Sequence, residues 1–163
     1  MNPIALVALG SNLGESRRIL DTAMSRLQRF ATSLQRSSLW QSSPVDCPPE
    51  SPPFVNAAAA LETLAGETPE SLLQKLQALE RELGRQPKQV LNEPRHIDLD
   101  LIAFGDETRA TPRLTLPHPR AHLRRFVLEP LNEIAPNVIL PGQSLNIGEL
   151  LARIRSDEQV IRM

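Results

Sequence analysis

The stretch Arg95-His96-Ile97-Asp98-Leu99-Asp100-Leu101-Ile102 alternates apolar and acidic residues, which is the period of a β-strand. Its apolar residues would face one side of a sheet, and Asp98 and Asp100 would share the other, with their Cα atoms roughly 7 Å apart. Mg²⁺ takes one or two carboxylates and fills its other positions with water and phosphate oxygens. Arg95 would add a planar, permanently charged group for phosphate. The alternation by itself favours a plainer interpretation, an edge strand with a solvated acidic face.

The composition is that of an ordinary globular protein. The 163 residues suffice for one domain with a proper core, with 40% apolar and 23% charged residues. A net charge of -1 gives no general attraction to nucleic acid or to a membrane, and no stretch has the apolar length of a membrane span. Cys47 is the only cysteine, which excludes an intrachain disulfide and a cysteine zinc cage. Because the N-terminus also lacks the charged start of a signal peptide, we expect a cytoplasmic protein. We also expect a monomer whose partners are small molecules and not nucleic acid or a membrane.

The chain before the acidic stretch predicts two strands, a helix and a proline-rich loop. Residues 4–9 form a short apolar run, which indicates a buried strand. Ser16 is a candidate N-cap for a helix over residues 16–34, and residues 37–43 can form a second strand. Five of the ten residues in 44–53 are proline, so we predict a loop of the length that often carries function.

A second strand–helix unit leads into the acidic stretch. Residues 54–62 have a strand pattern, and Thr68-Pro69-Glu70 combines a cap, a proline and an acid that together begin a helix well. A stripe of leucines carries this helix to about Leu83, and Gly84 closes it. A polar loop over residues 85–94 then precedes the acidic strand.

The remaining residues predict a short extension. Residues 114–118 are extended, residues 121–135 are helical with an interruption at Pro130, and residues 147–154 form a final helix. The order β-α-β-β-α-β, followed by this strand and helix extension, is that of the ferredoxin-like fold. We therefore predict a single α+β domain over residues 1–163, with an antiparallel sheet and helices packed on one face.

Arginines and a histidine around the acidic strand are candidates for phosphate binding. Arg85 and Arg95 bracket a loop suited to closing over a polyphosphate, and Arg113 and Arg124 follow the strand, although a solvated surface charge is the alternative for each. His118 precedes a proline, which disfavours a helix there. We therefore expect a phosphate contact or a surface imidazole, and no zinc pair. No Gly-Lys-Ser/Thr follows the N-terminal glycines, which excludes P-loop chemistry.

Two phenylalanines and an asparagine suggest a site for a flat heterocycle. Phe54 directly follows the proline-rich loop, and Phe126 lies beside two arginines. Their rings could sandwich a heterocycle, while the Asn56 amide offers donors and an acceptor to its edge. The alternative, that both phenylalanines belong to the core, is equally compatible with the pattern.

Six segments, in order, resemble one known family. They are Gly10-Ser11-Asn12-Leu13, Phe54-Val55-Asn56-Ala57-Ala58, Leu83-Gly84-Arg85, Pro94-Arg95-His96-Ile97-Asp98-Leu99-Asp100-Leu101-Ile102, Leu114-Thr115-Leu116-Pro117-His118-Pro119 and Arg124-Arg125-Phe126-Val127-Leu128-Glu129-Pro130-Leu131. Spread over essentially the whole chain, they resemble 6-hydroxymethyl-7,8-dihydropterin pyrophosphokinases, folate-pathway enzymes that move pyrophosphate from ATP to the pterin's hydroxymethyl group. The resemblance implies a Mg²⁺-dependent diphosphokinase with ATP as co-substrate and AMP as product.

The resemblance also implies a role for each site residue. Asp98 and Asp100 would hold two Mg²⁺ ions, Arg85 and Arg95 would stabilise the transferring group, and Asp98 would also orient or deprotonate the hydroxyl. The implied ATP site comprises Leu73, Gln77, Glu80, Arg85, Arg95, Leu101, Arg113, Thr115, His118 and Arg124. The implied pterin site comprises Ser43, Pro44, Asp46, Phe54, Asn56 and Phe126.

The chain departs from the family pattern in the loop before the acidic strand. This chain has Leu91, Asn92 and Glu93 where the family usually has a basic residue, an aromatic and a glycine. Pro87 stands in place of a loop arginine, and Pro119 stands in place of a tyrosine. Such a loop should close less firmly, so we expect a working but slower enzyme. Two alternatives stay open: a pterin- or nucleotide-binding homologue without turnover, and a metal-dependent phosphohydrolase on the same kind of sheet.

Overall fold

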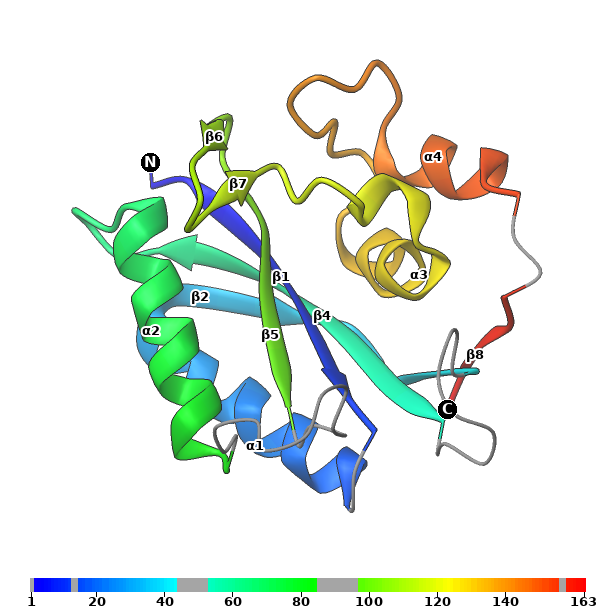
Figure 1. Ribbon diagram of the computed structural model, residues 1–163, viewed down its shortest axis with the longest axis horizontal. Helices are drawn as coiled ribbons and strands as arrows, with labels where there is room; N and C mark the ends of the chain where they lie inside the picture. The colour runs from blue at the N-terminus through cyan, green and yellow to red at the C-terminus, as the bar shows by residue number, and fades with distance from the viewer. Residues whose placement is uncertain (1, 13–14, 44–52, 85–96, 156–157) are drawn as a thin grey trace.

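The computed structural model describes residues 2–12, 15–43, 53–84, 97–155 and 158–163. Its main sheet has six strands, each antiparallel to its neighbours (Figure 1). The strands are β1 (Ile4–Ser11), β2 (Ala31–Arg36), β3 (Trp40–Ser42), β4 (Phe54–Thr63), β5 (Asp98–Phe104) and β8 (Val160–Arg162). Their order is β5-β1-β4-β3-β8, and β2 pairs with β4 beside β3. A second, two-stranded sheet joins β6 (Arg109–Ala110) to β7 (Thr115–Leu116).

The succession of elements confirms the predicted α+β, ferredoxin-like arrangement. The chain runs β1, α1 (Ser16–Leu27), β2 and β3, β4, α2 (Pro69–Glu82) and β5, which is βαββαβ with its second strand in two pieces. The pieces β2 and β3 pair with different ends of β4. The acidic strand β5 lies at one edge of the sheet, as its alternation suggested.

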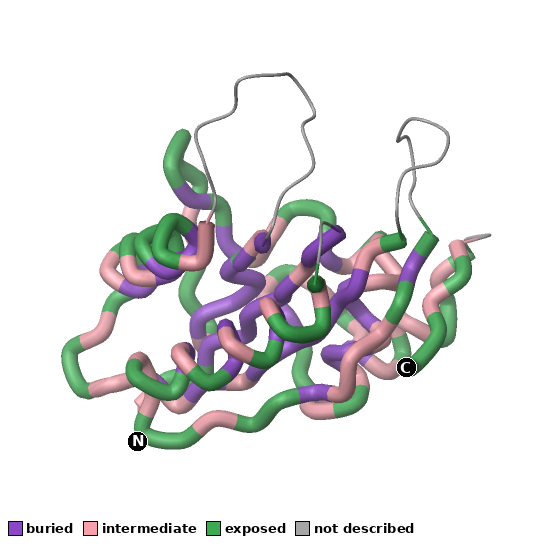
Figure 2. The backbone as a smooth tube through the Cα atoms, turned by 90° about the horizontal axis from the view of Figure 1, so that it is seen from below, coloured by how far each residue is buried: buried purple, intermediate pink, exposed green. Residues whose placement is uncertain are grey.

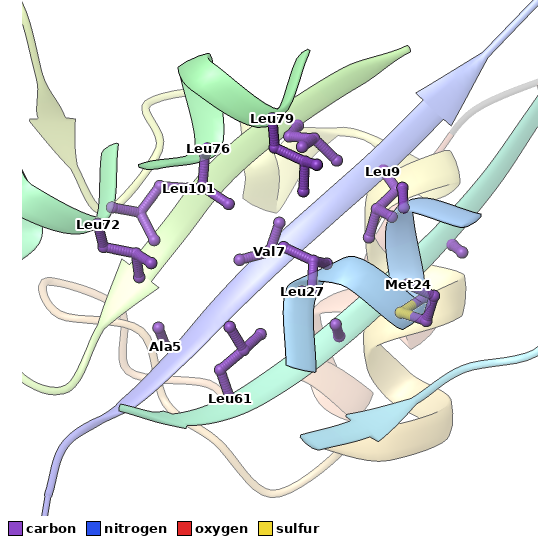
Figure 3. Packing of buried hydrophobic residues seen from close by; sticks show 14 of the residues in the cluster. Ala5, Val7, Leu9, Met24, Leu27, Leu61, Leu72, Leu76, Leu79 and Leu101 are labelled. Carbon is purple, nitrogen blue, oxygen red and sulfur yellow. The ribbon is translucent and has the colours of Figure 1, made fainter. Parts of the chain in front are cut away.

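Helices α1 and α2 cover one face of the sheet. Ala5, Val7 and Leu9 of β1 point to that face and pack with residues of both helices in one buried cluster (Figure 3). The leucine stripe of α2 lies in the same cluster, and its three buried members are at most 1% exposed. Fully burying one such side chain contributes about 1.5–3 kcal/mol, so this stripe fixes α2 against the sheet.

The N-terminus of α2 has the predicted cap. The Thr68 Oγ1 accepts a hydrogen bond from the Ser71 N–H at 3.1 Å, and the Ser71 Oγ accepts one from the Thr68 N–H at 2.9 Å. Pro69 occupies the first helical position, and Gly84 follows the helix with φ 102°, a backbone conformation that favours glycine. Local sequence therefore defines both ends of the helix that supplies one wall of the site.

The C-terminal extension covers the opposite face, so the prediction that the helices pack on one face is correct only for α1 and α2. Here α3 (Arg125–Ile134) and α4 (Ile147–Arg153) pack against the other set of alternating residues, among them Leu6 and Ala8 of β1. The sheet thus lies between two helical layers, and Figure 2 shows buried residues gathered along the middle of the molecule. In the part of the chain that the structure describes, no helix is both long and apolar enough to cross a membrane.

The predicted helix over residues 16–34 is wrong in its second half. Helix α1 ends at Leu27, a short 3₁₀ turn follows, and β2 begins at Ala31. The apolar spacing of Leu27, Phe30, Ala31 and Leu34 fits a helix, but the edge of β4 needs a hydrogen-bonding partner, and residues 31–36 supply it. Ser16 is the first helical residue and not the cap, since its Oγ accepts a hydrogen bond from the Ser11 Oγ at 3.1 Å.

Two further predictions need adjustment, and one strand is new. The strand expected over residues 37–43 is confined to β3, and the strand β8 was not predicted. Pro130 does not interrupt α3, because its ring is buried on the helix face toward the core, and that packing compensates for one missing backbone hydrogen bond. The break before α3 falls at Arg124, whose backbone is extended.

Candidate active site

The acidic strand presents its carboxylates over small residues of the neighbouring strand. In the pairing of β5 with β1, Asp98 stands opposite Gly10 and Asp100 opposite Ala8. The intervening Leu99 and Leu101 are 4% exposed and face the α1–α2 layer. The predicted division of the strand into an apolar and an acidic face is therefore confirmed, and the residues beside the carboxylates on β1 are small.

A pocket of about 440 Å³ lies along β5 and collects most of the predicted ATP-site residues. Both aspartates line it, together with side chains from α2 and from the segment around β7. Its lining consists of Leu73, Gln77, Glu80, Asp98, Leu99, Asp100, Leu101, Pro112, Arg113, Leu114, Thr115, His118 and Pro119. Leu99, Pro112, Leu114 and Pro119 were not among the predicted site residues, because only the fold brings their positions to the pocket.

Three of the predicted arginines do not appear in this lining. Arg85 and Arg95 lie outside the described residues, as do Pro44 and Asp46 of the predicted pterin site. The Arg124 guanidinium lies over the ring of Phe126, 5.5 Å from its centroid. This distance is within the range of a cation–π contact.

Glu80 joins the wall of the pocket to the acidic strand. Its side chain is buried at 6% exposure, and its Oε2 accepts a hydrogen bond from the Leu99 N–H at 2.8 Å. Leu99 lies between the two aspartates in sequence. A carboxylate accepting a backbone N–H is a strong, charge-assisted bond, so Glu80 sets where β5 lies against α2.

His118 presents a defined nitrogen to the pocket. The backbone N–H of His118 donates to the Ile102 carbonyl at 2.8 Å. The ring Nδ1 accepts a hydrogen bond from the backbone N–H of Arg120 at 3.2 Å. In the neutral ring the proton is therefore on Nε2. Burial lowers the pKa of His118, and Arg124 and Arg120 add to this effect, while Asp100 opposes it. The side chain is thus a neutral hydrogen-bond donor at physiological pH.

The second group of candidates lies on the face that carries the aspartates. Gly10 of β1 pairs with Asp98 on one side and with Asn56 of β4 on the other, so all three residues share one row across the sheet. Asn56 is 4% exposed, and its Nδ2 donates to the Ser42 Oγ at 2.8 Å. Phe54, two residues earlier, points to the same face.

Helix α3 completes this second region. Phe126, in its first turn, packs against the buried cluster on the same face of the sheet as Asn56. Ser43 is exposed, and its N–H donates to the Gln159 carbonyl at 3.4 Å. Ser42 was not among the predicted residues, because its contact with Asn56 depends on the register between β3 and β4.

Comparisons with known proteins show the family to which this chain belongs. Residues 6–136 match the family model of 7,8-dihydro-6-hydroxymethylpterin-pyrophosphokinase (HPPK). The 2-amino-4-hydroxy-6-hydroxymethyldihydropteridine pyrophosphokinase of Pseudomonas aeruginosa is 40% identical over 148 residues, which cover 90% of this chain and 88% of the relative. The enzyme of the same name from Haemophilus influenzae is 36% identical over 161 residues, or 98% and 97% of the two chains. The chain therefore belongs to the HPPK family.

Solved structures share the fold. The crystal structure of Plasmodium falciparum HPPK-DHPS, wild type with SDX-DHP, superposes with a TM-score of 0.75 at 15% identity over 94% of this chain. This chain spans 44% of that longer chain. The two chains therefore share a fold, although few of their aligned residues are identical.

Proposed function

We propose that the pocket along β5 binds ATP and that the region between β4 and α3 binds the dihydropterin. Family membership makes the protein an ATP-dependent diphosphokinase of folate biosynthesis, which transfers pyrophosphate to 6-hydroxymethyl-7,8-dihydropterin and releases AMP. One observation supports the division into two sites. Asp98 and Asp100 line the pocket with the predicted ATP residues, and they share a sheet face with Asn56.

The two aspartates are suitable ligands for Mg²⁺. They project from one strand face, with Cα atoms roughly 7 Å apart. Two carboxylates suffice for such an ion, because Mg²⁺ keeps water and phosphate oxygens as its other ligands. We propose that Asp98 and Asp100 hold two Mg²⁺ ions. Bound Mg²⁺ would neutralise phosphate charge and polarise the phosphoryl oxygens.

Side chains of the pocket would orient ATP. Leu73 and Leu101 offer apolar surface to the adenine, while Gln77 and Thr115 offer hydrogen-bonding groups. The Nε2–H of His118 and the Arg113 guanidinium would donate to phosphate or ribose oxygens, and Arg124 would add positive charge nearby. Arg85 and Arg95 keep the role that the resemblance implies, stabilising the transferring group.

The pterin would lie across the row of Asn56, Gly10 and Asp98. Two strand spacings separate Asn56 from Asp98 by roughly 10 Å, a span that suits a bicyclic ring with its hydroxymethyl group. Phe54 and Phe126 would stack on the ring, and Asn56 would read its edge, with Ser43, Pro44 and Asp46 contributing backbone groups. This orientation brings the hydroxyl to the acidic strand.

The transfer itself requires alignment more than covalent chemistry. The hydroxyl oxygen attacks the β-phosphorus in line, the bond from that phosphorus to the oxygen bridging the α-phosphate breaks, and AMP leaves with the bridging oxygen. The Asp98 carboxylate would orient the hydroxyl and accept its proton. We also propose that residues 1–163 act as one catalytic domain in a cytoplasmic monomer, which size-exclusion chromatography can test for the oligomeric state.

Substitutions in the two regions test their assignment separately. Arg113→Gln should raise the KM for ATP about tenfold and leave the KM for the pterin within about twofold. Asn56→Ala should do the reverse, because of the two substrates only the pterin would contact the lost amide. If Asn56→Ala changed only the KM for ATP, the assignment of the two sites would be wrong.

A further inference from the structure

Glu133 receives more hydrogen bonds than its position on a helix explains. Its two carboxylate oxygens accept the Ser38 N–H, each at 3.0 Å, and they also accept the Ser38 Oγ–H at 2.6 Å and the Trp40 Nε1–H at 3.0 Å. Glu133 is the second-last residue of α3, where the helix dipole disfavours a negative charge. Its placement therefore serves the contact with the sheet and not the helix.

We propose that Glu133 is a positioning residue for pterin binding, which holds β3 against α3 and thereby sets the Asn56 amide. The inference rests on the proposed pterin site. Both ends of α3 would then act on pterin binding. Its first turn carries Phe126, which would stack on the pterin, and its last turn carries Glu133.

Glu133 holds a segment that strand pairing leaves incomplete. Between β2 and β3, Ser37 still bonds to β4, with its N–H donating to the Ala58 carbonyl at 2.9 Å and its Oγ accepting the Ala58 N–H at 2.8 Å. The next N–H, that of Ser38, donates to Glu133 instead. This N–H has no partner on a neighbouring strand. The side chain of Glu133 is exposed, and its carboxylate takes the place of that strand here.

Strand β3 passes this constraint to the pterin region. Trp40 pairs with Asn56 and Ser42 pairs with Phe54. The position of β3 therefore influences the position of both predicted pterin residues on β4. The Ser42 Oγ then accepts the Asn56 Nδ2–H at 2.8 Å, and both side chains are at least 96% buried. A shift of β3 would therefore move or release the amide that reads the pterin edge.

The charge of Glu133 is maintained by the same neighbours. Burial raises the pKa of Glu133, but the hydrogen bonds from Ser38 and Trp40 and the charge of Arg162 outweigh that effect, and the pKa lies below its usual value. Arg162 belongs to β8 and pairs with Trp40 on the far side of β3. The family match ends at residue 136, so β8 lies beyond the matched region.

The test is the Glu133→Gln variant, which keeps the size of the side chain but loses acceptor capacity. We expect the KM for 6-hydroxymethyl-7,8-dihydropterin to rise about tenfold while the KM for ATP stays within about twofold. Trp40 is the only tryptophan, so its fluorescence should also shift when its indole N–H loses the charged acceptor. Ser38→Ala removes one donor and should raise the pterin KM in the same direction by less.

Glu149→Gln is the matched control. The Glu149 carboxylate also accepts a backbone N–H at 3.0 Å, from Asn146, but it lies on α4 and caps that helix. Glu149→Gln should lower the melting temperature about as much as Glu133→Gln does, and it should leave the pterin KM unchanged. An unchanged pterin KM in both Glu133→Gln and Ser38→Ala, or a parallel rise of both KM values, would overturn the inference. A normal pterin KM in Asn56→Ala would instead overturn the proposed pterin site.

Discussion

The buried carboxylate of Glu80 accepts the backbone N–H of Leu99 at 2.8 Å, and this contact joins α2 to the acidic strand. Leu99 separates Asp98 from Asp100, so the bond fixes the strand at the point where both carboxylates project. Glu80 also lines the pocket with them. The position of the proposed metal site is therefore set by a helix whose own ends are defined by local sequence.

Removing this contact should weaken both folding and ATP binding. Glu80→Ala leaves the buried Leu99 N–H without its acceptor, which should lower the free energy of unfolding by about 1–3 kcal/mol and raise the KM for ATP. Glu80→Gln keeps an acceptor oxygen and should show a smaller loss of stability. Urea unfolding and the KM for ATP measure the two effects, and equal stability of wild type and Glu80→Ala would contradict this account of the contact.

Gly10 gives a graded test of the row that links the two sites. A Cβ at this position would lie 3.5 Å from the Asn56 Oδ1, an ordinary contact distance. Gly10→Ala should therefore keep a near-normal KM for the pterin. Gly10→Val adds two methyl groups against the amide and should raise the pterin KM about tenfold or more. Equal KM values in the two variants would show that Asn56 is not held over Gly10.

His118 should contribute a pH-dependent part of the stability. Because its folded pKa lies below the ordinary value of 6.5, the native state binds fewer protons here than the unfolded chain does. The native state therefore loses stability as the pH falls through 6.5 toward the folded pKa. Above this pH range His118 is neutral in both states, and it causes no pH-dependent change in stability. The difference in unfolding free energy between wild type and His118→Gln should change between about pH 7.5 and pH 5.5. A pH-independent difference would contradict the shift.

Local sequence was sufficient for the elements whose pattern is self-contained. The alternation around Asp98 identifies an edge strand with an apolar and an acidic face, and the structure has both. Thr68, Pro69 and Gly84 define the ends of α2 before any packing is known. The resemblance then supplied the predicted ATP-site residues, most of which line one pocket.

Contacts across the sheet could not be predicted in this way. The bond from Trp40 to Glu133 joins residues 93 positions apart, and the bond from Asn56 to Ser42 requires the register of β3 on β4. Residues 31–34 have a helical spacing, yet the open edge of β4 makes them a strand. These cases share one cause, because the partner that decides the structure lies elsewhere in the chain.

The unusual loop residues Leu91, Asn92 and Glu93 lie outside the described residues, so the expected slower turnover stays a prediction. Replacing Asn92 with Trp should restore the aromatic that the resemblance places in this loop. We expect this variant to raise kcat/KM for ATP with no change in the pterin KM. An unchanged kcat/KM would show that the loop composition does not limit the reaction.

The central claim is that Asp98 and Asp100 support pyrophosphoryl transfer to the pterin. Its most direct test is AMP release from ATP and Mg²⁺, with and without 6-hydroxymethyl-7,8-dihydropterin, in wild type, Asp98→Asn and Asp100→Asn. We expect pterin-dependent AMP release by the wild type and a loss of about 1,000-fold or more in each folded variant. Wild-type rates in both variants, or AMP release that does not require the pterin, would contradict it.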